Sequence, residues 1–232
     1  MRWIMIFVAL IVAIANAEPA TFRAVSQPAT RAPYSIAEII KQARDVKTCS
    51  QVPAKAVKLV SAEQTSKRIK QLFKADQADR QGDMSKLGQN DIEKLIAQDL
   101  NRQQETLEYI LKDRLRTDTD FLGAGFIFQH GNCSDSYLLA HQLAGYAIAL
   151  SESTVSRGEQ KEISRWLYAA TFDRYLRSQN KPQKFGTQYI TTDCAALQEF
   201  DPTTRDEERA HYGVPTLEQA KARVAEFGTP CK

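Results

Sequence analysis

The sequence lacks the short motifs that usually identify a reaction. It has no His-Glu-x-x-His zinc motif, no Gly-x-Ser-x-Gly nucleophile motif and no glycine-rich phosphate-binding loop. Its histidines, His130, His141 and His211, lie far apart in the chain, so a metal site would need the fold to bring them together with carboxylates. We therefore predict no metal and no cofactor.

An excess of charge of either sign is also missing. The chain has 31 lysine and arginine residues against 28 aspartate and glutamate residues, and the two signs are interleaved. A nucleic-acid-binding protein would be expected to carry a distinct basic face. We therefore predict no nucleic-acid partner.

Apolar runs that approach membrane-spanning length are missing, and the longest run lies at the start of the chain. Residues 4–15 are all apolar, which is too short to span a bilayer. The following Ala15-Asn16-Ala17 fits the small-x-small rule for signal peptidase. We expect a signal peptide over residues 1–17, a periplasmic or secreted product, and no membrane association after cleavage. An uncleaved anchor is the alternative, which Asn16 and Pro19 oppose.

Cysteine is present in small, even number and never as Cys-x-x-Cys. This spacing disfavours zinc and thioredoxin-like chemistry, and an even number in an exported chain favours disulfides. Of the three possible pairings we favour Cys49–Cys231 with Cys133–Cys194. Four buried free thiols are the alternative.

Helical signals dominate the rest of the sequence. Residues 18–34 are rich in Ala, Pro, Thr and Ser and indicate a flexible leader. Capping-box patterns at Ser35, Ser61, Asn90 and Thr216 predict helix starts. The expected helices cover residues 36–46, 61–81, a long stretch from 90, 135–150, 160–178, 206–212 and a last segment from 216.

Two segments depart from regular amphipathic helices. The apolar stretch 121–129 carries Gly123 and Gly125, which indicate close packing against a neighbour. Residues 185–192 alternate and contain β-branched and aromatic side chains, which predicts a short strand or an extended loop. No βαβ alternation occurs. We predict a mainly α fold: a single multi-helix domain over residues 35–232, with at most a short strand or hairpin near 185–192.

Polar side chains continue the apolar stripe of three helices. In the second helix, the stripe of Ile69, Leu72 and Phe73 reaches polar positions when it is extended by the helical period. The same holds for the ends of segments 121–129 and 160–178. The polar side chains reached in this way are Asp76, Gln77, Arg80, Gln129, His130, Asp173 and Arg174.

Buried charges cost several kcal/mol, on the order of 3–5, unless they are paired. Both signs are present among these positions, so we hypothesise that the three helix ends meet in one polar cluster. The alternative is that each helix end simply enters solvent.

Several segments resemble an uncharacterised bacterial family that is catalogued as a domain of unknown function. The resemblance covers residues 69–224. Its marks are Asp76-Gln77-Ala78-Asp79-Arg80, Phe128-Gln129-His130, Phe172-Asp173-Arg174, Pro182-Gln183-Lys184-Phe185-Gly186-Thr187-Gln188 and the tail 206–217. The chain has Phe185 where the family more often has Tyr. The resemblance implies a shared site that includes Gln183, Thr187 and Gln188, but it implies no activity.

Three functions fit this set of residues. The first is binding of a small polar or anionic ligand by Gln77, Arg80, Gln129, Arg174, Gln183, Thr187 and Gln188, since amide and guanidinium groups are hydrogen-bonding recognisers. The second is a hydrolase of the envelope or the exterior, with His130 and Asp76 or Asp173 as catalytic residues. The third is an inhibitor or immunity protein that binds a protein partner.

Overall fold

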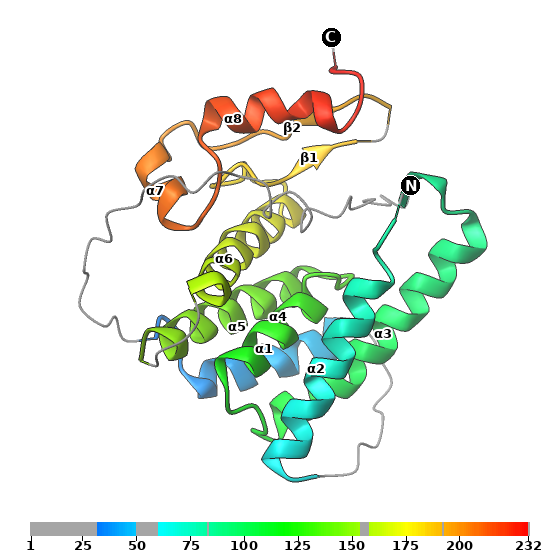
Figure 1. Ribbon diagram of the computed structural model, residues 1–232, viewed down its shortest axis with the longest axis vertical. Coiled ribbons are helices and arrows are strands. Elements are labelled where there is room, and N and C mark those ends of the chain that lie inside the picture. The colour runs from blue at the N-terminus through cyan, green and yellow to red at the C-terminus, as the bar shows by residue number, and fades with distance from the viewer. Residues whose placement is uncertain (1–31, 50–59, 83, 154–157, 192, 232) are drawn as a thin grey trace.

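The computed structural model describes residues 32–49, 60–82, 84–153, 158–191 and 193–231, and it is mainly helical (Figure 1), which confirms the predicted fold class. The predicted signal peptide, and the leader before residue 32, lie outside the described residues. The α-helices are α1 (Ile36–Cys49), α2 (Ala62–Ala78), α3 (Gln89–Leu111), α4 (Asp118–Phe128), α5 (Ser134–Ser153), α6 (Gly158–Ser178), α7 (Asp206–His211) and α8 (Leu217–Ala222). Short 3-10 turns cover Met84–Lys86 (η2) and Arg223–Glu226 (η3).

Three of the four predicted caps begin a helix, namely those at Ser35, Ser61 and Thr216. Ser61 accepts a hydrogen bond from the Gln64 amide, and the Gln64 side chain accepts one from the Ser61 amide; Thr216 begins α8 in the same way. The prediction at Asn90 was wrong. Helix α3 begins one residue earlier, and the Asp91 carboxylate accepts the Gly88 amide at 3.2 Å.

Helix α4 is the centre of the bundle. All its residues from Phe121 to Phe128 are buried, and it packs on α2 and α5, as Figure 1 shows. A Cβ atom on Gly123 would lie 3.1 Å from Ile69, and one on Gly125 would lie 3.0 Å from Leu167. These contacts confirm that the glycines allow close approach of neighbouring elements.

The C-terminal elements gather at the end of α6. Figure 1 shows β1 (Tyr189–Ile190), β2 (Ala196–Leu197), α7 and α8 at this end of the molecule. The two strands pair antiparallel, with Tyr189 opposite Leu197. The extended segment predicted over 185–192 is therefore a two-residue strand, because the residues before it form a turn around Gly186, whose φ is +72°.

A disulfide joins Cys194 to Cys231, with 5.0 Å between their Cα atoms. The pairing favoured from the sequence was wrong, because it assigned these two cysteines to different partners. Cys133 is also disulfide-bonded. Among the described helices, none is long and apolar enough to cross a membrane.

We predict that protonation of His141 opposes folding in acid. His141 is 2% exposed and its Nδ1–H donates to the Tyr168 carbonyl at 2.8 Å. Burial lowers its pKa to about 4, whereas an unfolded histidine has a pKa of about 6.5. Between these two values the unfolded chain binds a proton and the native chain does not. The free energy of unfolding should fall by about 3 kcal/mol from this residue as the pH drops from 6.5 to 4.

Urea unfolding at a series of pH values measures this loss. His141→Gln, whose amide can still donate to the same carbonyl, should flatten the slope. An unchanged slope in that variant would show that His141 is not the group responsible.

Candidate functional site

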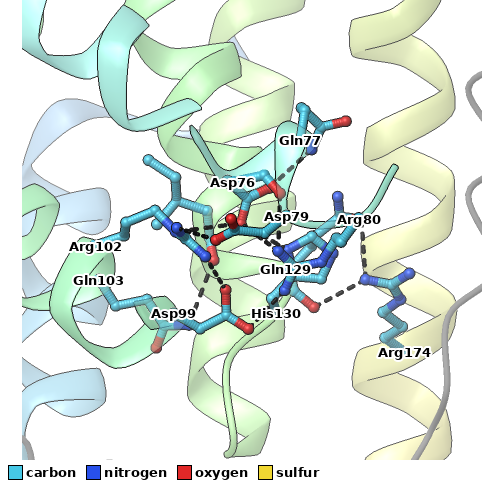
Figure 2. Close-up of polar contacts among 11 residues, drawn as sticks. Asp76, Gln77, Asp79, Arg80, Asp99, Arg102, Gln103, Gln129, His130 and Arg174 are labelled. Atoms are coloured by element: carbon cyan, nitrogen blue, oxygen red, sulfur yellow. Dashed lines mark hydrogen bonds and ion pairs between the residues drawn. The ribbon is translucent and has the colours of Figure 1, made fainter. Parts of the chain in front are cut away.

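The C-terminal end of α2 carries a buried carboxylate with several donors. Asp76 is 1% exposed. Arg80 donates from Nη1 to the Asp76 carbonyl at 3.0 Å and to Oδ1 at 3.1 Å, and Gln77 donates from Nε2 to Oδ2 at 2.8 Å. The α2 stripe therefore ends in a paired charge, as its sequence pattern predicted (Figure 2).

His130 reaches the same carboxylate from the end of α4. Its Nδ1 lies 3.1 Å from Asp76 Oδ1, and its side chain is 8% exposed. A neutral imidazole beside a carboxylate places its proton on Nδ1 and donates it to the carboxylate. The lone pair then lies on Nε2, which has no hydrogen-bond partner in the described part of the chain.

Helix α3 supplies two site residues that the sequence reasoning missed, Asp99 and Arg102. Asp99 accepts from Arg80 Nη2 at 2.6 Å and from Arg102 Nη2 at 2.8 Å. Arg102 also donates to Asp79 at 2.7 Å. The signal was present, because extending the α3 stripe from Leu95 by four and seven residues reaches these two positions.

The charged side chains around Asp76 and His130 form one polar cluster, and its charges balance when His130 is neutral. The three carboxylates of Asp76, Asp79 and Asp99 lie among three guanidinium groups, those of Arg80, Arg102 and Arg174 (Figure 2). A proton on His130 would add an uncompensated buried charge, which is costly.

The pKa shifts of His130 and Asp76 are consistent with this charge balance. Burial lowers the pKa of His130, and Arg80 and Arg174 lower it further against the opposing effect of Asp76. Burial raises the pKa of the Asp76 carboxyl, but His130 and Arg80 outweigh burial, so this pKa is lowered. Near pH 7 the pair is therefore a carboxylate and a neutral imidazole.

Arg174 brings the end of α6 to the same place. Its Nη1 donates to the Gln129 carbonyl at 2.8 Å and to Gln129 Oε1 at 2.9 Å, and its Nε donates to Gln188 Oε1 at 3.3 Å. Burial lowers the pKa of Arg174 to about 10, so it stays charged at neutral pH. The three helix ends thus converge, as hypothesised from the sequence.

Asp173, in contrast, belongs to a separate arrangement. It is fully buried, and its carboxylate accepts from the backbone amides of Lys184, Phe185 and Thr187 and from the Thr187 hydroxyl, at 2.7–3.0 Å. Both oxygens therefore accept hydrogen bonds from the turn that follows α6 and stabilise it. Asp173 is therefore poorly placed to be the partner of His130.

Gln183 and Gln188 organise the same turn. The Gln183 side chain donates to the carbonyls of Gln188 and Gln198 and accepts the Gln188 amide. Gln188 donates to the Ala170 carbonyl and to the Thr187 hydroxyl. Of the residues predicted from the 182–188 motif, Gln188 alone contacts the cluster, through Arg174.

A metal ion is a poor fit to the cluster. Asp76, Asp99 and His130 bring three potential ligand atoms within 4.8 Å of one another. However, Arg80 donates to both carboxylates and Arg102 donates to Asp99. A divalent cation would have to displace these guanidinium groups, so the arginines take the place that a metal would need.

Three polar atoms around Arg174 form no hydrogen bond within the described residues. They are His130 Nε2, Gln129 Nε2 and the hydroxyl of Tyr137. Because Gln129 Oε1 accepts from Arg174, its amide NH₂ must point the other way. Tyr137, near the start of α5, interacts electrostatically with Arg174; its neighbouring sequence carries no signal that would have revealed it.

An open hollow of about 460 Å³ lies elsewhere, between β2, α8 and the C-terminal residues. Its lining is mostly apolar and includes Leu197, Phe200, Lys221 and Val224. No residue predicted for the site lines this hollow.

Comparisons with known proteins returned no match: no family model, no curated protein and no solved structure matches this chain. The resemblance to the uncharacterised bacterial family therefore stays a prediction, carried by the motifs alone.

We predict that Asp173→Asn destabilises the fold by about 3 kcal/mol or more, because the new amide would turn an N–H group toward donors that have lost their acceptor. Thr187→Val, which removes only one of the four donors, should cost about 1 kcal/mol. Guanidinium unfolding measures both. Similar values for the two variants would contradict the assignment of Asp173 as the anchor of the turn.

Proposed function

We propose that this protein is an exported hydrolase that acts on a neutral, polar ester or amide, with His130 as the general base and Asp76 as the residue that orients it. The observation that carries the proposal is the Asp76–His130 pair, in which Nδ1 is fixed at 3.1 Å from the carboxylate while Nε2 has no partner in the described chain.

The ionisation state supports this role. A general base must be unprotonated at the working pH and must have its reactive nitrogen free. Burial and the two neighbouring arginines lower the pKa of His130, and the Asp76 carboxylate selects the tautomer with the lone pair on Nε2.

The neighbouring donors support a carbonyl substrate. The outward NH₂ of Gln129 and the hydroxyl of Tyr137 are donors of the kind that stabilise an oxyanion. The arginines, in contrast, are committed to protein acceptors and their charge is balanced. This favours a neutral polar group over the anionic ligand expected from the arginines alone.

The proposed reaction needs only water. Nε2 of His130 removes a proton from a water molecule as its oxygen attacks the carbonyl carbon, and the negative charge on the carbonyl oxygen is stabilised by Gln129 and Tyr137. The tetrahedral intermediate then collapses, and the leaving alcohol or amine takes the proton back from Nε2. Asp76 stays ionised throughout and stabilises the imidazolium.

The disulfide supports the exported location. Disulfides persist in oxidising compartments such as the periplasm or the exterior, and Cys194 and Cys231 are bonded. We therefore also propose that the chain works outside the cytoplasm, in agreement with the predicted signal peptide.

We predict that diethyl pyrocarbonate, which acylates neutral imidazole, modifies His130 in the native protein. The pH midpoint of the modification rate should lie below about 6.5 because the pKa of His130 is lowered. Peptide mass spectrometry identifies the modified residue. His141 is the internal control and should be inert, since it is 2% exposed and stacked among aromatic rings. Protection of His130 in the folded protein would exclude it as a base.

We predict that the protein hydrolyses p-nitrophenyl acetate, a small neutral ester, and that His130→Gln lowers kcat/KM by about 10²-fold. Tyr137→Phe should lower kcat and leave the pH midpoint unchanged, because it removes only a proposed oxyanion donor. Exposed His211 offers the matched control, and His211→Gln should retain full activity. Equal rates for the wild type and His130→Gln would rule out this reaction class.

A further inference from the structure

The first turns of α3 extend past the end of α2, as Figure 1 shows. Arg68, within α2, pairs with Glu105 of α3. Arg80, just after the end of α2, pairs with Asp99. The two helices therefore run antiparallel, and residues 89–98 of α3 lie beyond the part that α2 covers.

An apolar stripe runs along this extension of α3. Its members are Ile92, Leu95 and Ile96. They precede Asp99 by seven, four and three residues, so they share its face of the helix. Ile92 and Leu95 are half-buried, whereas Ile96 is 51% exposed. None of the three is among the side chains that form the described hydrophobic core or pack against it. The face of α3 that carries Asp99 thus continues as an uncovered apolar surface.

The stripe begins within one helical turn of a residue that lies close to the proposed base. A carboxylate oxygen of Asp99 lies within 4.8 Å of a ring nitrogen of His130. Ile96 lies about 4.5 Å before Asp99 along the helix axis, and Ile92 about 10 Å before it. An extended chain that starts at a carbonyl beside His130 therefore has the stripe within its reach.

The residues beside the stripe indicate which apolar group fits it. Asp91 and Glu93 flank the stripe on its two sides and are exposed, whereas Lys94 lies on the opposite side of the helix. Acidic flanks repel an anionic chain such as a fatty acid. They also repel each other if a second copy of the protein packs here about a two-fold axis. The flanks therefore favour a neutral apolar chain.

We propose that the stripe of Ile92, Leu95 and Ile96 binds the apolar acyl chain of the substrate. This inference rests on the proposed function, and it narrows the substrate class to esters or amides with an uncharged acyl chain of medium length. The ester or amide group is then the neutral polar part that faces His130, and the stripe adds apolar binding that increases with chain length. Ile96 is the main specificity-determining residue, because it is the most exposed of the three.

A series of p-nitrophenyl esters tests the stripe, with acetate, butyrate and hexanoate as acyl groups. In the wild type, kcat/KM should rise about twofold for each added methylene, which corresponds to burial of about half of each methylene. Ile96→Gln should lower the hexanoate value about threefold or more and leave the acetate value unchanged. Equal kcat/KM for acetate and hexanoate in the wild type would overturn the inference and leave the role of His130 intact.

The matched control is Ile190→Gln. Ile190 lies on β1 and is the other exposed large hydrophobic side chain among the described residues, at 43%. This variant should keep the chain-length dependence of the wild type. An equal loss of hexanoate activity in Ile96→Gln and Ile190→Gln would contradict the assignment of the stripe.

Binding of a ketone separates the stripe from the reaction, because a ketone has the carbonyl and the chain but no leaving group. Isothermal titration of the full chain should give a Kd for hexyl methyl ketone about tenfold or more below that for acetone, and Ile96→Gln should reduce this difference. Chain-dependent ketone binding in a protein that hydrolyses no ester would support the stripe and exclude the proposed hydrolase. Ketone binding that does not depend on chain length would refute the stripe.

Sedimentation velocity tests the other occupant of this face. We expect the same sedimentation coefficient for the wild type and Ile96→Gln at all concentrations. A dimer that Ile96→Gln dissociates would assign the stripe to self-association instead of substrate binding.

Discussion

The Asp76 carboxylate is the constraint around which the bundle is organised. It is almost completely buried, and it accepts hydrogen bonds from Arg80, Gln77 and His130. Its desolvation has to be offset by donors that lie in fixed directions. These come from α2 itself and from the end of α4, while α3 joins through Asp99 and Arg102. The same carboxylate therefore fixes how these helix ends face one another, which apolar packing alone would specify less sharply.

The network links stability to the proposed chemistry. Because the three carboxylates are matched by three guanidinium groups, a neutral His130 is the state that leaves no unbalanced buried charge. That is also the state in which an imidazole can accept a proton. Acid should therefore affect folding and reactivity together, since protonating His130 disturbs the balance and removes the base. Removing one partner of a buried ion pair also leaves the other partner as an unpaired buried charge, which lowers the free energy of unfolding.

The sequence predicted the fold class and part of the polar cluster, for identifiable reasons. Local patterns such as the capping box at Ser61 depend on neighbouring residues, and this box was confirmed. The convergence of Arg80, His130 and Arg174 followed from the cost of burying charge. The sequence could not show that Asp173 and Arg174 belong to different sites. Adjacent helix positions point about 100° apart, and only the fold shows which neighbours each side chain contacts. Disulfide pairing and the position of Tyr137 beside Arg174 depend on contacts between distant segments, for which a single sequence carries no signal.

Residues 121–128 of helix α4 are all apolar and buried, and a Cβ atom on Gly123 or Gly125 would press against Ile69 or Leu167. Such close packing leaves little room for translation or rotation of the helix about its axis. His130 follows the last turn of this helix, so the close packing of α4 also limits the movement of the imidazole. A larger side chain at Gly123 or Gly125 would therefore shift α4 and, with it, the imidazole of His130.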